Sequence, residues 1–283
     1  MIKKILSFYT VISMLATVVA VSVFPGVAAE ARRPEREVKL PKQAVQVEDN
    51  VFSLGEIQDP QTGQMVEGFA IIHYKEGKGK IGTGKNARLP ACYGYLASGA
   101  KWKVVEPWQI NPLNSGLDNS AAFSILNNGI VKWEDAADGV INNVMGANIL
   151  GDGFLASEDL ISQVGTLNGK NEVYFGSLNP GIIAVTYVWG IFSGPTYQRK
   201  LVEWDQVYNT YYPWSSDVLS DPAGSAKMDF DNIATHELGH SVGMNDLYNS
   251  VCSQETMYGY ANFGEILKRS LNYGDIAGIN KLY

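Results

Sequence analysis

The residues of this 283-residue chain that are best suited to chemistry lie between His236 and Asp246. His236 and His240 are four positions apart, and Glu237 directly follows the first of them. On a helix, residues four apart project from the same face, so the two imidazoles can bind one metal ion. Glu237 then lies beside that ion, where a base is needed to deprotonate a bound water. Gly243 permits a turn, which brings Asp246 back as an oxygen ligand.

This set of residues fits the hydrolysis of peptide bonds. Zinc held by three protein ligands keeps a fourth position for water and lowers the pKa of that water toward about 7. Glu237 can take a proton as the water attacks a peptide carbonyl, and can then pass it to the leaving amine. We therefore predict a zinc peptidase in which Glu237 is the catalytic base. The predicted zinc ligands are His236, His240 and Asp246.

Two further residues bear on the metal site. Glu265 lies 25 residues after His240 and is an alternative third ligand, but no motif surrounds it, so Asp246 is favoured. Met257 follows the predicted metal helix at a distance typical of a methionine turn beneath a zinc site. An ordinary methionine of the core is the alternative interpretation.

In these residues the chain resembles the metzincin metallopeptidases, and most closely the matrixin-like branch in its microbial, secreted form. The resemblance covers about residues 92–283 and rests on Cys92 and Trp102 and on residues 182–189, 234–240, 257–260 and 275–279. It implies a zinc-dependent endopeptidase with an active-site cleft across the domain. Matrixins usually have a third histidine where this chain has Asp246, and some microbial metzincins use aspartate there. Structural calcium ions that brace the loops are a further candidate cofactor, which the sequence leaves open.

The elements that must position these residues are indicated by apolar spacing. Helices are predicted over residues 119–136, from a cap at Asp229 to about Val242, and over residues 273–282. Strands are predicted at residues 102–110, 171–176, 182–189 and 201–208. With the resemblance, this order predicts an α+β, zincin-like catalytic domain. It would have one twisted mixed sheet, a long backing helix, an active-site helix and a C-terminal helix. We expect residues 182–189 to form an edge strand that pairs with extended substrate.

The N-terminus has the pattern of a secretory signal. Lys3 and Lys4 precede an apolar run that ends near Val23, and small residues follow up to Ala29. We expect residues 1–29 to be a signal peptide and the protein to be secreted, either free or associated with the cell envelope. A retained membrane anchor is the alternative, since the run is near the lower length limit for spanning. After signal cleavage we expect no stable membrane insertion.

The segment before the main domain differs from it in character. Strand-like runs at residues 51–57 and 66–74 flank a strong turn sequence, so a hairpin is predicted. Residues 75–90 are rich in glycine and lysine, which is typical of a flexible linker. We interpret residues 30–74 as a pro-segment that is removed on activation, with a retained N-terminal extension as the alternative. The catalytic domain is then residues 91–283.

The histidine and the cysteines outside the motif have simple interpretations. His73 lies in a strand-like run and is taken as an ordinary strand residue rather than an inhibitory ligand. Cys92 and Cys252 are the only cysteines, and an even pair in a secreted chain is most simply a disulfide. Cys92 also loosely resembles the pro-segment thiol that keeps many matrixins latent by binding zinc, although its flanking residues fit that motif poorly.

Charge narrows the range of partners. Residues 89–283 carry 20 acidic against 10 basic residues, which disfavours nucleic acid and anionic membranes. We expect a peptide or protein substrate and a monomer. Two other functions remain as alternatives: a non-catalytic, zinc-stabilised binding or adhesion module, and a zinc amidase acting on cell-wall peptide. Glu237 argues against the module, because a structural zinc site is normally closed by a fourth ligand and has no use for that carboxylate.

Overall fold

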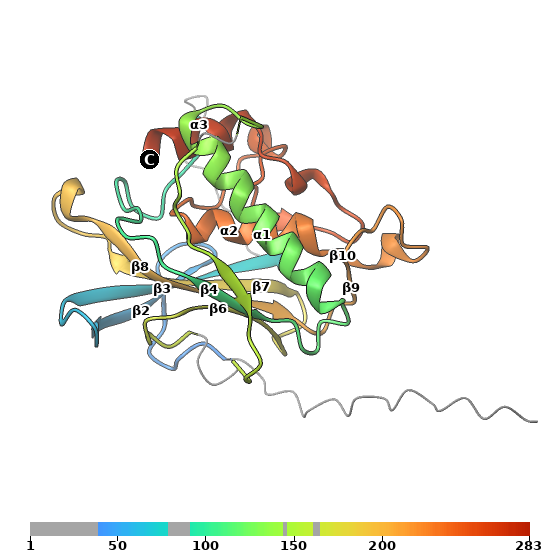
Figure 1. Cartoon of the computed structure of the whole chain (residues 1–283), viewed down its shortest axis with the longest axis horizontal. Helices are drawn as coiled ribbons and strands as arrows, with labels where there is room; N and C mark the ends of the chain where they lie inside the picture. The colour runs from blue at the N-terminus through green and yellow to red at the C-terminus, as the bar shows by residue number, and fades with distance from the viewer. Residues whose placement is uncertain (1–38, 79–90, 144–145, 161–164) are drawn as a thin grey trace, which may run out of the picture. The chain divides into compact units, whose positions relative to one another are not determined.

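One mixed β-sheet organises the part of the chain that the structure describes (Figure 1). The computed structural model describes residues 39–78, 91–143, 146–160 and 165–283. The strand order is β1-β2-β3-β7-β8-β6-β4-β5, and β11 pairs with β3 off this path. The strands are β1 (Val45–Gln46), β2 (Val51–Gln58), β3 (Met65–Lys75), β4 (Trp108–Asn111), β5 (Gly153–Leu155), β6 (Asn171–Gly176), β7 (Ile182–Ile191), β8 (Lys200–Asn209) and β11 (Tyr260–Ala261). The expected signal peptide and most of the expected linker lie outside the described residues.

Three α-helices of the described chain lie on one face of this sheet (Figure 1). They are α1 (Asn119–Asp135), α2 (Phe230–Ser241) and α3 (Tyr273–Leu282). The helices α1 and α2 pack closely at Gly129, where a Cβ atom would lie 2.6 Å from a methyl group of Leu238. A short parallel pair, β9 (Trp214–Ser215) and β10 (Met228–Asp229), precedes α2. This arrangement confirms the predicted α+β, zincin-like domain with a backing helix, an active-site helix and a C-terminal helix.

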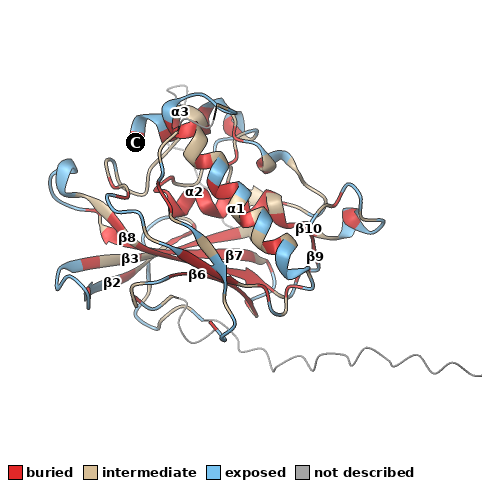
Figure 2. Cartoon of the chain, in the orientation of Figure 1, coloured by how far each residue is buried: buried red, intermediate tan, exposed pale blue. Residues whose placement is uncertain are grey.

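Apolar side chains are buried on both faces of the sheet. The central strands of the sheet are coloured mostly as buried in Figure 2. Along β7, Ala184 and Val188 belong to the core beneath the helices, whereas Val185 and Tyr187 belong to a second core. This alternation follows from the period of two in a strand, where successive side chains point to opposite faces. It places Thr186 on the helix side, which becomes important for the site. None of the helices in the described ranges is long and apolar enough to cross a membrane.

The predicted N-terminal hairpin is present, but it is part of the main sheet. Strands β2 and β3 pair antiparallel, and β3 in turn pairs antiparallel with β7. The register of β3 on β7 runs from Glu67 opposite Gly190 to Tyr74 opposite Ile182. Because β8 covers the other side of β7, the expectation that residues 182–189 form a sheet edge is wrong for the full chain. The backbone groups of that edge are already paired with β3.

The first strand of the main domain differs from its prediction, and the disulfide matches its prediction. The first strand of the main domain is shorter than expected and covers only Trp108–Asn111. Pro107 directly before it has no amide hydrogen to donate to a ladder, which limits the strand at this end. The expected disulfide between Cys92 and Cys252 is present. It links the start of the main domain to the segment that follows the metal motif.

Candidate metal centre

Helix α2 carries three predicted site residues into the interior. Its first turn is fixed by Asp229, whose carboxylate accepts a hydrogen bond of 2.9 Å from the backbone N–H of Asn232. The side chains of His236, Glu237 and His240 follow, and each of these residues is 0% exposed. The predicted helix therefore brings the two imidazoles and the carboxylate to one buried region between α2 and the sheet.

The chain reverses after α2 and returns Asp246 to the two histidines. The turn is at Gly243, whose φ is +103°, a conformation that residues with a side chain rarely adopt. A Cβ atom at Gly243 would also lie 2.9 Å from the carbonyl oxygen of Ala100. Beyond the turn, the N–H of Asn245 donates to the carbonyl of Gly94 at 3.0 Å. These contacts fix the path of the segment that presents Asp246.

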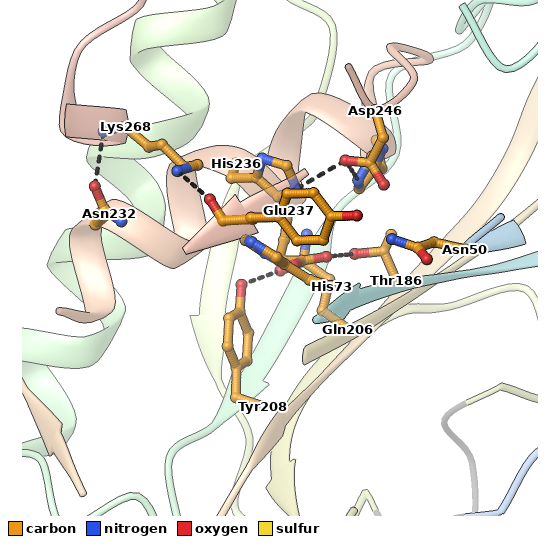
Figure 3. A network of polar contacts seen from close by, with 12 residues as sticks. Asn50, His73, Thr186, Gln206, Tyr208, Asn232, His236, Glu237, Asp246 and Lys268 are labelled. Atoms are coloured by element: carbon orange, nitrogen blue, oxygen red, sulfur yellow. Dashed lines mark hydrogen bonds and ion pairs between the residues drawn. The ribbon is translucent and has the colours of Figure 1, made fainter. Parts of the chain in front are cut away.

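Three ligand-type atoms converge at this point (Figure 3). Oδ1 of Asp246 lies 3.2 Å from Nε2 of His236 and 3.5 Å from Nε2 of His240. All three atoms are buried and have no hydrogen-bond partner among the described residues. Tetrahedral zinc with bonds of about 2.0–2.2 Å places its ligand atoms about 3.3–3.6 Å apart, so distances of 3.2 and 3.5 Å suit this ion. Buried polar atoms without partners are rare, and a shared cation explains all three.

Each histidine is oriented by its other ring nitrogen. Nδ1 of His236 lies 2.7 Å from the carbonyl oxygen of Thr256, and Nδ1 of His240 lies 3.1 Å from that of Met244. A backbone carbonyl can only accept, so Nδ1 carries the proton and Nε2 presents a lone pair. Hydrogen bonds of this kind fix the tautomer and the ring orientation of metal-binding histidines.

Asp246 is held through its second oxygen. The hydroxyl of Tyr248 donates to Oδ2 of Asp246 at 2.7 Å, and the side-chain amide of Asn50 donates to the same hydroxyl. Burial alone would raise the pKa of Asp246, but the neighbouring His240 and His236 lower this pKa well below its usual range. Asp246 is therefore charged and oriented, with Oδ1 left for a cation.

The predicted methionine turn lies beneath the metal helix. Met257 is fully buried, and a Cβ atom at Gly239 of α2 would lie 2.1 Å from its sulfur. The carboxylate of Asp275 in α3 accepts hydrogen bonds from the N–H groups of Thr256 and Met257, at 2.7 and 3.2 Å. The C-terminal helix thus anchors the turn that supports His236 through Thr256.

Glu237 is bonded at both carboxylate oxygens (Figure 3). Its Oε2 accepts a hydrogen bond from the hydroxyl of Thr186 in β7, and its Oε1 lies 2.9 Å from Nδ1 of His73 in β3. Burial raises the pKa of Glu237, although the nearby His236 and His240 act in the opposite direction. Burial also lowers the pKa of His73 to about 3, so this imidazole is neutral, and one hydrogen bond joins its Nδ1 to Oε1 of Glu237.

A model of the matrixin family matches residues 108–283, which is more than half of the chain. The chain belongs to the matrixin family. Membership supports a zinc metallopeptidase, in agreement with the donor set around α2. It also agrees with the resemblance inferred from the sequence.

Two other comparisons add little to this assignment. A solved structure of metalloproteinase-II from Bacteroides fragilis is similar over 84% of this chain and 80% of that chain. The sequence identity is 11% and the TM-score is 0.34, which is too low to decide the fold or the function. A search of curated protein sequences finds no significant match.

Two alternatives considered for this matrixin are not favoured by the structure. Glu265 contacts the ammonium group of Lys268 and lies 3.4 Å from the amide of Asn232. Among the described residues, it belongs to neither of the groups of side chains that are arranged to hold a metal ion. Cys92 is paired with Cys252, so it has no thiol with which to block zinc.

The position of His73 was not anticipated. The sequence pattern predicts an ordinary strand residue at this position, but His73 contacts Glu237, and its ring centroid is 4.0 Å from that of His236. The contact depends on the pairing of β3 with β7, which the local sequence does not reveal. The sequence of this matrixin offered one sign of such a role. His73 is its only histidine outside the metal motif, and it lies in an apolar strand-like run.

Proposed function

We propose that this matrixin is a secreted zinc endopeptidase in which His236, His240 and Asp246 hold the zinc and Glu237 is the general base. The observation that carries the proposal is the convergence of three buried ligand atoms that lack other partners. Glu237 adjoins them, as a base must if it is to act on water at the metal. The family assignment supports the same chemistry at a coarser level.

The zinc ion and the protein side chains would supply different parts of the hydrolysis. When bound, zinc would polarise water and the substrate carbonyl and would stabilise negative charge on the carbonyl oxygen. Glu237 would accept the proton from the attacking water and deliver it to the leaving amine. Because Thr186 donates to Oε2, Oε1 is the oxygen available for this transfer once His73 has left it. Burial raises the pKa of Glu237, which makes its carboxylate a stronger base than an exposed one.

Secretion and removal of the pro-segment are the second part of the proposal. The signal-like residues 1–29 and the disulfide between Cys92 and Cys252 support export into an oxidising environment. We further propose that residues 30–74 are a pro-segment, released by cleavage in the linker at residues 75–90. Mass spectrometry of active, secreted protein tests this point, because an intact N-terminus near Glu30 would contradict it.

Hydrolysis of denatured casein by the secreted, processed protein tests the proposed activity. We expect cleavage that stops with a zinc chelator and returns when zinc is added back. A protein that binds zinc but leaves casein intact would instead support the non-catalytic module or the cell-wall amidase. Cleavage that the chelator does not affect would contradict the proposal outright.

A further inference from the structure

Thr186 places a hydroxyl group inside the core beneath the helices. It lies in the apolar strand β7 and is fully buried, and its neighbours on the same face, Ala184 and Val188, belong to that core. Burying a hydroxyl costs free energy unless the group is hydrogen-bonded. A valine has nearly the same shape and would suit the core without needing a partner. The presence of a threonine must therefore be explained by the group that its hydroxyl binds.

The partner of this hydroxyl is the carboxylate of Glu237 in helix α2. The hydroxyl of Thr186 donates to Oε2 of Glu237, although 51 residues separate the two in the sequence (Figure 3). A hydrogen bond to an ionised acceptor is stronger than one between neutral groups. The branched Cβ of threonine also restricts its χ1 rotation, so the backbone of β7 fixes where the hydroxyl lies.

The sheet holds the same helix at a second point, one turn further on. In the register of β7 on β8, Thr186 is opposite Gln206, whose side-chain amide donates to Oγ of Ser241 at 3.0 Å. Ser241 follows Glu237 by four residues, which is about one helical turn. Both strands belong to the predicted catalytic domain, so these contacts do not depend on the N-terminal hairpin.

The bond to Thr186 defines the direction of the other carboxylate oxygen. A glutamate side chain rotates about several bonds, so a carboxylate without a fixed partner would sample several positions. A ligand-type oxygen of Glu237 lies within 4.8 Å of a ligand-type nitrogen of His236, at the side of the predicted zinc position. A general base must come within hydrogen-bond reach of the proton that it takes, and an error of 1 Å can cost about 10²-fold in rate.

We propose that Thr186 is a positioning residue for the base: its hydroxyl fixes Oε2 of Glu237 and so directs Oε1 at the water to be deprotonated. Thr186 acts through Glu237 and takes no part in the proton transfer itself. This role rests on the proposed peptidase function, whereas the bond between the two side chains does not. If the hydroxyl only fastened α2 to the sheet, its removal would lower stability and leave turnover unchanged.

The first test compares kcat, KM and zinc content among variants of the secreted, processed protein on a peptide substrate. Thr186→Val removes the hydroxyl, and Thr186→Ser keeps it. Thr235→Val is the matched control, because Thr235 is also fully buried and its hydroxyl donates to a carboxylate of the same helix, that of Asp231, at 3.0 Å.

We expect Thr186→Val to keep its zinc and its KM while kcat decreases by about 10²-fold. Thr186→Ser and Thr235→Val should keep most of the wild-type kcat. A Thr186→Val protein that turns over as fast as the wild type would overturn the proposal. An equal loss of kcat in Thr235→Val would overturn it too, because any weakening of α2 would then have the same effect.

The second test needs neither zinc nor activity. Urea unfolding of the metal-free full chain is measured for the wild type, Thr186→Val, Glu237→Ala and the double variant. Side chains that interact directly give non-additive losses, so we expect the double variant to lose less free energy of unfolding than the sum of the two single variants. Additive losses would contradict the proposal. A wild type that cleaves no peptide would contradict the peptidase function and with it the positioning role, although the coupling would persist.

Discussion

Nδ1 of His73 lies 2.9 Å from Oε1 of Glu237, although 164 residues separate the two in the sequence and both are fully buried. The contact joins the N-terminal hairpin to the helix that carries the predicted catalytic base. It means that the full chain and a chain without the hairpin differ at the reacting groups themselves. We therefore expect metal binding and activity to differ between the full chain and the chain without the hairpin.

Tyr248→Phe tests the support of the third predicted ligand. The variant removes the hydroxyl that donates to Asp246 at 2.7 Å, so Asp246 should be oriented less well. Loss of such a partner typically lowers metal affinity by about 10–100-fold. Competition for zinc with a chromophoric chelator measures the change, and Tyr211→Phe, at an exposed tyrosine, is the control. Equal affinity in both variants would argue against ligation by Asp246.

Gly243→Ala tests the turn that returns Asp246. The new Cβ would meet the carbonyl oxygen of Ala100 at 2.9 Å in a backbone with φ of +103°. Gly116→Ala is a matched control, because Gly116 has φ of +74° and open space around its Cβ position. Strain at positive φ costs about 1–2 kcal/mol in both variants. We expect Gly243→Ala to lose measurably more unfolding free energy than Gly116→Ala in urea, and equal losses would show that the close contact is harmless.

Glu203→Gln tests a buried carboxyl on β8. Burial raises the pKa of Glu203 to about 7, from 4.5 when the group is exposed, despite hydrogen bonds from Asn168 and Gly169. Between about pH 4.5 and pH 7, Glu203 is therefore protonated in the folded state and ionised in the unfolded state. Stability contributed by this group is present below pH 4.5 and decreases as pH rises to about 7, by roughly 3 kcal/mol at most.

Urea unfolding at pH 5 and pH 8 measures this dependence. The wild type should lose free energy of unfolding between the two pH values, and Glu203→Gln should lose less of it, whatever its absolute stability. An equally steep decrease in the variant would assign the pH dependence to other groups. Asp205, whose pKa burial also raises well above its usual range, is the first of these.

The parts of the site that could be predicted are those set by local sequence. His236, Glu237 and His240 share one helix, and a single glycine turn returns Asp246, so residue spacing was enough to predict that they meet. The disulfide was predictable because Cys92 and Cys252 have no other possible partners.

The errors share one physical origin. The pairing of β3 with β7 depends on the register between two strands more than 100 residues apart, which nothing in either segment specifies. Residues 182–189 are apolar almost throughout, as any buried strand would be, and this does not identify the strand that pairs with them. The sequence therefore left residues 182–189 as an edge and His73 as an ordinary strand residue, and only the tertiary structure brought His73 to Glu237.

Whether Glu237 is the base of a zinc endopeptidase is decided by a comparison of three processed proteins. Processed wild type, Glu237→Gln and Glu265→Gln are assayed for kcat/KM on a peptide substrate, and the zinc content of each is measured. We predict that Glu237→Gln keeps its zinc while kcat/KM decreases by about 10²–10⁴-fold. Glu265→Gln, which alters the alternative ligand, should keep both its zinc and most of its activity. A zinc-loaded Glu237→Gln protein that cleaves as fast as the wild type would show that Glu237 is not the base.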